Sequence, residues 1–185
     1  MNSLSDRYDR LTRAFHWLTA AVVIFMFASA HVWENLAKGT PLRKGLQSVH
    51  ISLGIAMALL IAARLLWRLF GGKRLKADSH PVLNLLAKMA HGCLYLLLLA
   101  QIALGFLYRW AQGEPFNFFG LFSVPAPFGV DHEWRGTLGD LHNDVAWAII
   151  VLAGLHAGAA LWHHCVMRDG TLRRMLPRPR SAWQK

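Results

Sequence analysis

Apolar residues are concentrated in four long blocks, at residues 14–33, 47–70, 83–110 and 139–166. About 20 consecutive apolar residues are enough to cross the hydrocarbon core of a bilayer as a helix. A spanning segment must be a helix or a strand of a closed barrel, and these blocks are far too long for barrel strands. The connections are short or moderate, so consecutive helices lie antiparallel. The pattern predicts an all-α integral membrane protein, a four-helix up-down-up-down bundle formed by a single domain over residues 1–185.

The composition agrees with a membrane protein. Hydrophobic residues make up 55% of the chain and charged residues 16%, whereas soluble domains carry about 25% charged residues. The longest connection, residues 111–138, is aromatic and rich in Pro and Gly, and it is too interrupted to be a fifth span. The first block is not expected to be a cleaved signal peptide, because it contains His16 and no small-residue cleavage site follows it.

The distribution of Lys and Arg predicts the orientation. If the N-terminus is cytoplasmic, 14 of the 20 Lys and Arg residues lie in inner segments, and Arg64 lies inside the second block. Positive residues accumulate on the cytoplasmic side, so both termini are predicted to be cytoplasmic. The net charge of +10 resides at helix ends, so we expect the lipid bilayer as a partner and no nucleic acid. The five outer residues are Lys38, Arg43, Lys44, Arg109 and Arg135.

Histidines occur at informative positions within the predicted spans. His142 and His156 are 14 residues apart, which is nearly four helical turns, so they share one face and are separated by about 21 Å along the axis. In the alternating topology, His142 is outer and His156 inner, while His16 is inner and His50 outer. Two pairs follow: His50 with His142, and His16 with His156. A pairing of His16 with His163 also satisfies the helix geometry.

Two stacked pairs of neutral imidazoles in an apolar bundle are typical of bis-histidine haem ligation. Small residues follow these histidines by one turn, which leaves space for a macrocycle, at Ala20, Gly54, Ala146 and Ala160. Covalent c-type haem is excluded, because neither cysteine belongs to a C-x-x-C-H motif. A histidine-lined metal transporter is an alternative of another class, and it predicts no haem spectrum.

Four segments resemble the bacterial cytochrome b561 family, in a match that runs from residue 7 to residue 178. They are RYDRLTRAFHWLTAAVVIF, QSVHISLGIAMALLIAARLLWRLF, AHGCLYLLLLAQIALGFLYRWAQGEPFNFFGL and LHNDVAWAIIVLAGLHAGAALWHHCVMRDGTLRRMLPR. The order and spacing of the HW, GLHA and HH elements agree with the family. The resemblance implies a multi-pass protein of the bacterial inner membrane with two haem b groups. It also implies that their axial ligands, and hence the iron ligands, are His16 with His156 and His50 with His142.

The resemblance is closest to superoxide-oxidising members of that family. It implies that superoxide gives an electron to the outer haem, that the electron passes to the inner haem, and that ubiquinone is reduced. The five outer basic residues are candidates for steering the superoxide anion. His163 and His91 are candidates for the quinone site, because imidazole both hydrogen-bonds a carbonyl and transfers protons.

The remaining residues receive simpler interpretations. Arg64 is expected to neutralise a haem propionate or to extend toward the membrane surface. His31, His80 and His132 are expected to be ordinary polar residues. No obligatory protein partner is expected. The alternative within electron transfer is an anchor subunit that carries electrons between a hydrogenase or dehydrogenase and quinone.

Overall fold

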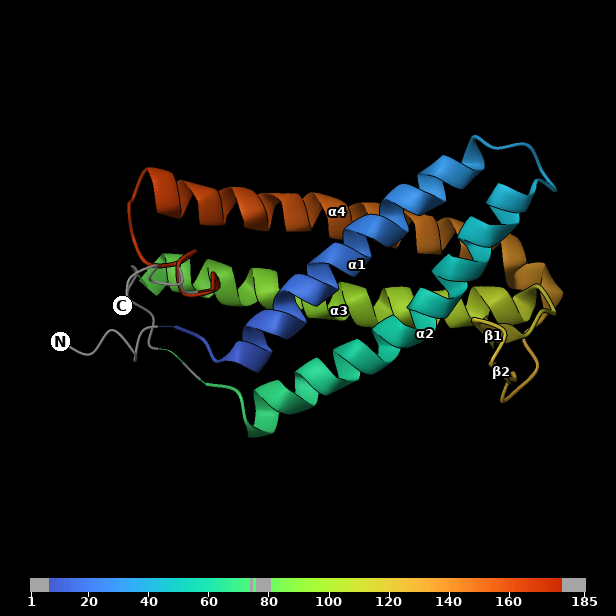
Figure 1. The fold of residues 1–185 in the computed structure, drawn as a ribbon, viewed down its shortest axis with the longest axis horizontal. Helices are drawn as coiled ribbons and strands as arrows, with labels where there is room; N and C mark the ends of the chain where they lie inside the picture. The colour runs from blue at the N-terminus through green and yellow to red at the C-terminus, as the bar shows by residue number, and fades with distance from the viewer. Residues whose placement is uncertain (1–6, 74, 76–80, 178–185) are drawn as a thin grey trace, which may run out of the picture.

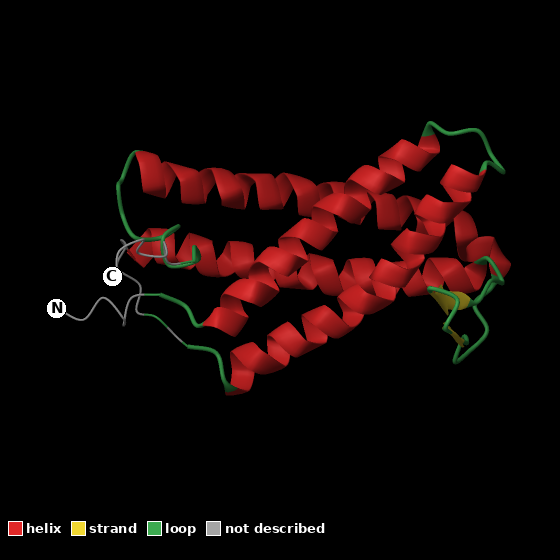
Figure 2. Cartoon of the chain, in the orientation of Figure 1, coloured by secondary structure: helices red, strands yellow, loops and turns green. Residues whose placement is uncertain are grey.

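The structure is a computed structural model that describes residues 7–73, 75 and 81–177. It contains four long helices, α1 (Arg10–Glu34), α2 (Pro41–Phe70), α3 (Pro81–Ala111) and α4 (Arg135–Cys165). All four are long and apolar enough to cross a membrane, which confirms the predicted four-helix architecture. Figures 1 and 2 show that the helices alternate in direction, and that α1 begins at the end of the bundle where α4 finishes.

The helices extend beyond the predicted apolar blocks, most clearly in α2, which begins at Pro41 rather than at residue 47. An apolar block marks only the part of a helix that lies in hydrocarbon, and the helix continues into the interface. Pro41 is a favourable first residue because its fixed φ suits a helix and its missing N–H has no intrahelical partner there. His80 lies outside the described residues, as do the basic residues Arg74, Lys76, Arg178, Arg180 and Lys185.

Asp9 caps α1 and ties it to the end of α2. Its carboxylate accepts hydrogen bonds from the Thr12 backbone N–H (2.8 Å) and hydroxyl (2.6 Å). It also accepts from the Trp67 indole and the Lys73 backbone N–H, each at 3.1 Å. Partial burial opposes ionisation, but these hydrogen bonds outweigh it and lower the pKa of Asp9 to about 2. The inner ends of α1 and α2 are therefore held together by one carboxylate.

The helices associate as two pairs. α1 packs mainly along α2 and α3 mainly along α4, while α2 and α3 touch less extensively. Figure 1 shows α1 and α2 crossing obliquely over α3 and α4. Large side chains bridge the pairs: the rings of Phe27 on α1 and Trp147 on α4 are 4.9 Å apart.

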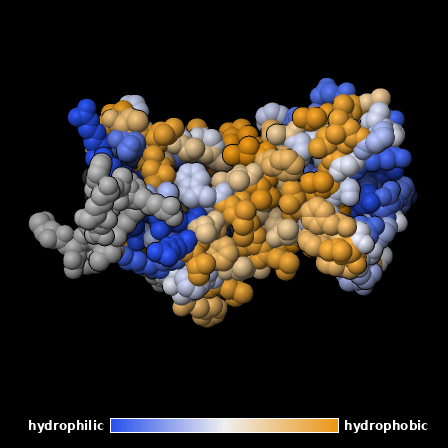
Figure 3. All heavy atoms as spheres, in the orientation of Figure 1, coloured by the Kyte–Doolittle hydropathy of each residue, from blue (hydrophilic) through white to orange (hydrophobic). Residues whose placement is uncertain are grey.

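The buried hydrophobic core of the bundle is small and lies midway along the helices. Met57, Ile61, Leu98 and Ile149 form one buried cluster. Most other large apolar side chains are exposed, and Figure 3 shows them gathered over the middle of the visible face, with hydrophilic residues toward both ends. In water such a surface would be unstable, whereas in a bilayer it contacts lipid chains.

The long outer connection contains a short hairpin that the all-α prediction did not include. Strands β1 (Phe116–Phe118) and β2 (Phe122–Val124) pair antiparallel, and a 3-10 turn, His132–Trp134, precedes α4. The fully buried Ser52 of α2 accepts a hydrogen bond from the Phe119 N–H at 2.9 Å. Phe116 stacks on Phe106 of α3 at 4.3 Å. The sequence analysis missed these strands because three residues are too few to show the alternation of apolar and polar residues that is typical of a strand.

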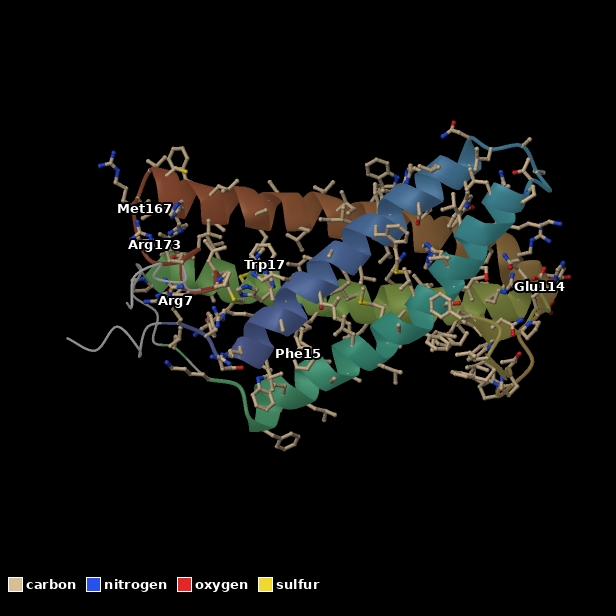
Figure 4. The ribbon with its side chains drawn as sticks, viewed as in Figure 1. Arg7, Phe15, Trp17, Glu114, Met167 and Arg173 are labelled. Carbon is tan, nitrogen blue, oxygen red and sulfur yellow. The ribbon has the colours of Figure 1, made fainter. Side chains whose placement is uncertain are left out.

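The chain after α4 returns to the start of α1. The Arg13 guanidinium donates to the Leu176 carbonyl at 2.8 Å, and the Trp17 indole donates to the Met175 carbonyl at 3.0 Å. In Figure 4, Arg7 and Arg173 lie at this end of the bundle, and Glu114 lies at the opposite end. The described part of the chain after α4 therefore lies against the first turns of α1.

Candidate haem sites

The structure brings four of the predicted histidines together as two pairs. The rings of His50 (α2) and His142 (α4) have centroids 6.4 Å apart and an interplanar angle of 73°. The rings of His16 (α1) and His156 (α4) are 6.3 Å apart with an angle of 71°. Both pairs join helices from opposite sides of the bundle, and the four-turn spacing of His142 and His156 places one pair toward each membrane surface.

The ring separations fit one metal ion held between each pair. A metal–imidazole bond is about 2 Å long, and a ring centre lies about 1.2 Å from its nitrogen. Two imidazoles on opposite sides of one iron therefore have centroids about 6.4 Å apart. No cluster of three or more His, Cys, Asp or Glu side chains suited to a metal ion occurs within the described ranges. The pairs thus suit the two open axial positions of haem iron.

The outer pair opens onto a large cavity. Its volume is 1310 Å³ and its wall includes both His50 and His142, so it exceeds the roughly 300–1,000 Å³ of ordinary ligand pockets. Nδ1 of each ring is buried without a hydrogen-bond partner. Gly105 of α3 permits the close approach of the His142 ring, since a Cβ at this position would lie 3.1 Å from Cε1. The outer site therefore has the space that a haem group requires.

Three residues around the outer pair were missed by the sequence analysis. Gln101 Nε2 lies 3.1 Å from His142 Nε2, the Trp33 ring is 4.9 Å from the His50 ring, and the Tyr108 ring is 6.5 Å from the His142 ring. Gln101 could have been found, because a lone amide inside an apolar span needs a polar partner. Trp33 and Tyr108 carried no such signal, because aromatic residues near helix ends are common in membrane proteins.

The inner pair has a third histidine and an arginine as close neighbours. The His91 ring (α3) is 5.0 Å from the His156 ring, so this quinone candidate adjoins the inner pair directly. Arg64 Nη2 (α2) is 3.2 Å from His16 Nδ1, and its guanidinium lies 5.2 Å from the centre of the Tyr95 ring. All four helices thus contribute a side chain to the inner site.

The other quinone candidate, His163, is engaged with the segment that follows α4. Its Nδ1 lies 2.5 Å from Asp169 Oδ2. Slight burial opposes ionisation of Asp169, but hydrogen bonds from His163 and Thr171 lower the pKa of this carboxyl to about 2. The alternative pairing of His16 with His163 receives no ring contact in the structure, which places His156 beside His16 instead.

The five outer basic residues differ in their contacts. Arg43, Lys44, Arg109 and Arg135 line the outer cavity, and Lys38 does not. Arg43 donates to the Trp33 and Leu36 carbonyls at 2.8 and 2.7 Å, so it caps the end of α1. Arg109 forms an ion pair with Glu114 at 2.5 Å. Lys44 and Arg135 are exposed at the cavity wall and are the stronger steering candidates.

The histidines interpreted as ordinary polar residues have local partners where they are described. His31 Nδ1 contacts the Phe27 carbonyl at 3.0 Å, one turn earlier in α1. His132 Nδ1 contacts the Ala111 carbonyl at 2.7 Å and so ties the 3-10 turn to the end of α3. His31 also lies on the wall of the outer cavity.

Four membrane-spanning helices with two facing histidine pairs define the class of transmembrane b-type cytochromes. A family model described as prokaryotic cytochrome b561 matches residues 7–178, and the chain belongs to this family. It is 35% identical to cytochrome b561 homolog 2 of Escherichia coli, over 96% of this chain and 95% of the relative. It is 30% identical to the probable superoxide oxidase CybB of Yersinia pestis, over 96% and 100%. It is 28% identical to a cytochrome b562 of Cereibacter sphaeroides, over 94% and 96%.

Family membership confirms the resemblance found in the sequence. The protein is a membrane electron-transfer protein that binds haem b and crosses the bacterial inner membrane several times. The metal-transporter alternative is thereby wrong.

Proposed function

We propose that this protein holds two haem b groups, takes electrons from superoxide at the outer membrane surface and delivers them to ubiquinone. The observation that carries the proposal is the repetition of one histidine-pair geometry in both halves of the bundle, with ring separations of 6.3 and 6.4 Å. A single haem would need only one such pair. Two pairs on facing helices suit a path that crosses the membrane.

The chain's own residues would hold the groups and control their surroundings. Each imidazole would hold the iron through one neutral nitrogen, and at the outer site Gln101 lies close enough to orient His142. The buried cluster of Met57, Ile61, Leu98 and Ile149 keeps water out of the region between the pairs. When bound, haem b would supply a one-electron carrier, and the two histidines of each pair would hold it.

Superoxide is the donor that the outer surface suits best. Lys44 and Arg135 are exposed at the wall of the cavity that contains His50 and His142. Positive charges at the mouth of a low-dielectric cavity raise the encounter rate of a small anion. The name of the Yersinia pestis relative, at 30% identity, points to the same donor.

The acceptor reaction requires two electrons and two protons. Two superoxide anions lose one electron each and become two molecules of oxygen, while one ubiquinone gains both electrons and two protons to form ubiquinol. His91 adjoins His156, and His163 lies two helical turns further along α4 beside Asp169. An imidazole in either position is able to hydrogen-bond a quinone carbonyl and pass a proton to it.

The experiment is turnover of the purified, haem-loaded protein with superoxide and a ubiquinone analogue. We expect two haem b per chain by pyridine haemochrome analysis and two superoxide consumed per quinol formed. Heat-inactivated protein with the same haem content controls for spontaneous dismutation. A haem stoichiometry of one, or haem reduction by quinol but never by superoxide, would contradict the proposal. If quinol but not superoxide reduces the haems, and a dehydrogenase or hydrogenase remains bound through purification, an anchor subunit would be favoured instead.

A further inference from the structure

Arg64 is a cation placed inside a membrane span next to the inner histidine pair. Its Nη2 lies 3.2 Å from His16 Nδ1, and its side chain is only partly exposed. The guanidinium lies over the Tyr95 ring of α3, 5.2 Å from its centre. Arg68, one turn later, lies over the same ring at 5.9 Å but is exposed. The two arginines therefore share one aromatic support but differ in burial and in contact with the haem-site histidine.

Arg64 carries a charge without a carboxylate partner. Among the residues the structure describes, the ion pairs are Arg109 with Glu114 and His163 with Asp169. A guanidinium remains protonated in proteins, so Arg64 cannot lower the cost of its intramembrane charge by losing a proton. An intramembrane cation is costly, and such residues mark functional sites. The contact with Tyr95 supports the charge but does not cancel it.

The contact with His16 determines how Arg64 must respond to haem. A guanidinium only donates hydrogen bonds, so Nδ1 of His16 accepts in this contact. A neutral imidazole that binds iron through Nε2 carries its proton on Nδ1 and can no longer accept there. If His16 held an iron through Nε2, it would no longer accept from Arg64, and the Tyr95 ring would remain as support for the guanidinium.

We infer that the charge of Arg64 raises the reduction potential of the inner haem. A higher potential at the inner haem favours electron flow from the outer pair to the inner one. Reduction adds one negative charge, and a nearby cation in a low-dielectric site stabilises the reduced form. The outer cavity also has basic residues in its wall, but Arg43 is bonded to backbone carbonyls and Arg109 is paired with Glu114. Lys44 and Arg135 are exposed, so water and salt screen their charges more than that of Arg64. This inference rests on the proposed presence of two haems.

The test is a potentiometric titration of the haem absorption bands in purified haem-loaded protein. Arg64→Gln removes the charge, Arg64→Lys keeps the charge without the fork of donors, and Arg68→Gln is the matched control one turn away. The His142→Ala variant assigns the remaining midpoint potential to the inner haem. We expect Arg64→Gln to lower the inner midpoint potential only, Arg64→Lys to restore most of it, and Arg68→Gln to cause a much smaller shift.

Several outcomes would overturn the inference. In one, Arg64→Gln retains both haems, and both midpoint potentials equal those of the wild type. In another, Arg68→Gln shifts the inner potential as much as Arg64→Gln does. If Arg64→Gln loses the inner haem, the inner midpoint potential of Arg64→Lys is the deciding measurement. A value equal to that of the wild type supports the role of the charge, and a lowered value refutes it. Failure of superoxide turnover leaves this titration unchanged, and a single haem per chain is detected beforehand by haem analysis, so failure of the proposed function is recognised separately.

Discussion

Gly105 of α3 offers a sharp test of the outer histidine pair. A Cβ at this position would lie 3.1 Å from Cε1 and 3.6 Å from Nδ1 of His142. Gly105→Ala therefore forces the imidazole to retreat by a few tenths of an ångström. Metal–ligand distances tolerate deviations of only about 0.2 Å. We expect the substitution to weaken or detach the outer haem while leaving the inner one in place.

Gly92→Ala is the matched control, because Gly92 lies in the same helix and a Cβ there meets nothing within 4 Å. Both substitutions gain the same intrinsic helix propensity, about 1 kcal/mol in favour of Ala. Their difference therefore isolates the clash with His142. Overpacking of this kind costs about 1–3 kcal/mol, so Gly105→Ala should be the less stable variant by that amount.

The assay combines haem content per chain with thermal unfolding followed by haem absorbance. Gly92→Ala should retain two haems and unfold at or above the wild-type temperature. Gly105→Ala should retain between one and two haems and lose its outer-haem spectrum at lower temperature. If both variants keep full haem content and unfold alike, the close approach of His142 to α3 has no role in haem ligation.

Three further outcomes are expected. His156→Ala should lose the inner haem, whereas His91→Ala should keep two low-spin haems and slow only quinone exchange; the reverse pattern in haem spectra would mean that His91 is the ligand. Replacing both Lys44 and Arg135 by Glu should slow haem reduction by superoxide, measured by stopped flow, and weaken its dependence on ionic strength, while an unchanged rate would rule out steering. The pKa of Asp9 is lowered from 3.8 to about 2, so its stabilising effect is complete above about pH 4 and is lost as the pH falls through about 2. Asp9→Asn should therefore lower the free energy of unfolding at neutral pH and reduce its dependence on pH in the acid range.

Much of the architecture follows from the sequence by local rules. The four apolar blocks predict four spans, because only an uninterrupted apolar helix is stable in hydrocarbon. The interval between His142 and His156 places them on one helix face, because the period of an α-helix is constant. The alternating topology then assigns His16 and His50 to opposite membrane sides. These conclusions need no knowledge of how the helices cross.

The tertiary structure decided the contacts that depend on helix rotation and crossing. His91 lies beside His156 and Arg64 beside His16, because α2 and α3 present these residues toward the same inner space. The sequence alone left His163 and His156 as alternative partners of His16, since residues two turns apart share a face. Only the relative displacement of α1 and α4 along their axes distinguishes the two.

The structure also decided which polar residues are already engaged. Arg43 and Arg109 look equivalent to Lys44 and Arg135 in the sequence, yet the first two are held by carbonyl groups and by Glu114. Ser52 is one more small residue in an apolar block until the hairpin folds over the outer end of α2 and Phe119 donates to it. Such interactions join residues that are distant in the chain, so helix period and hydropathy, which are local properties, carry no information about them.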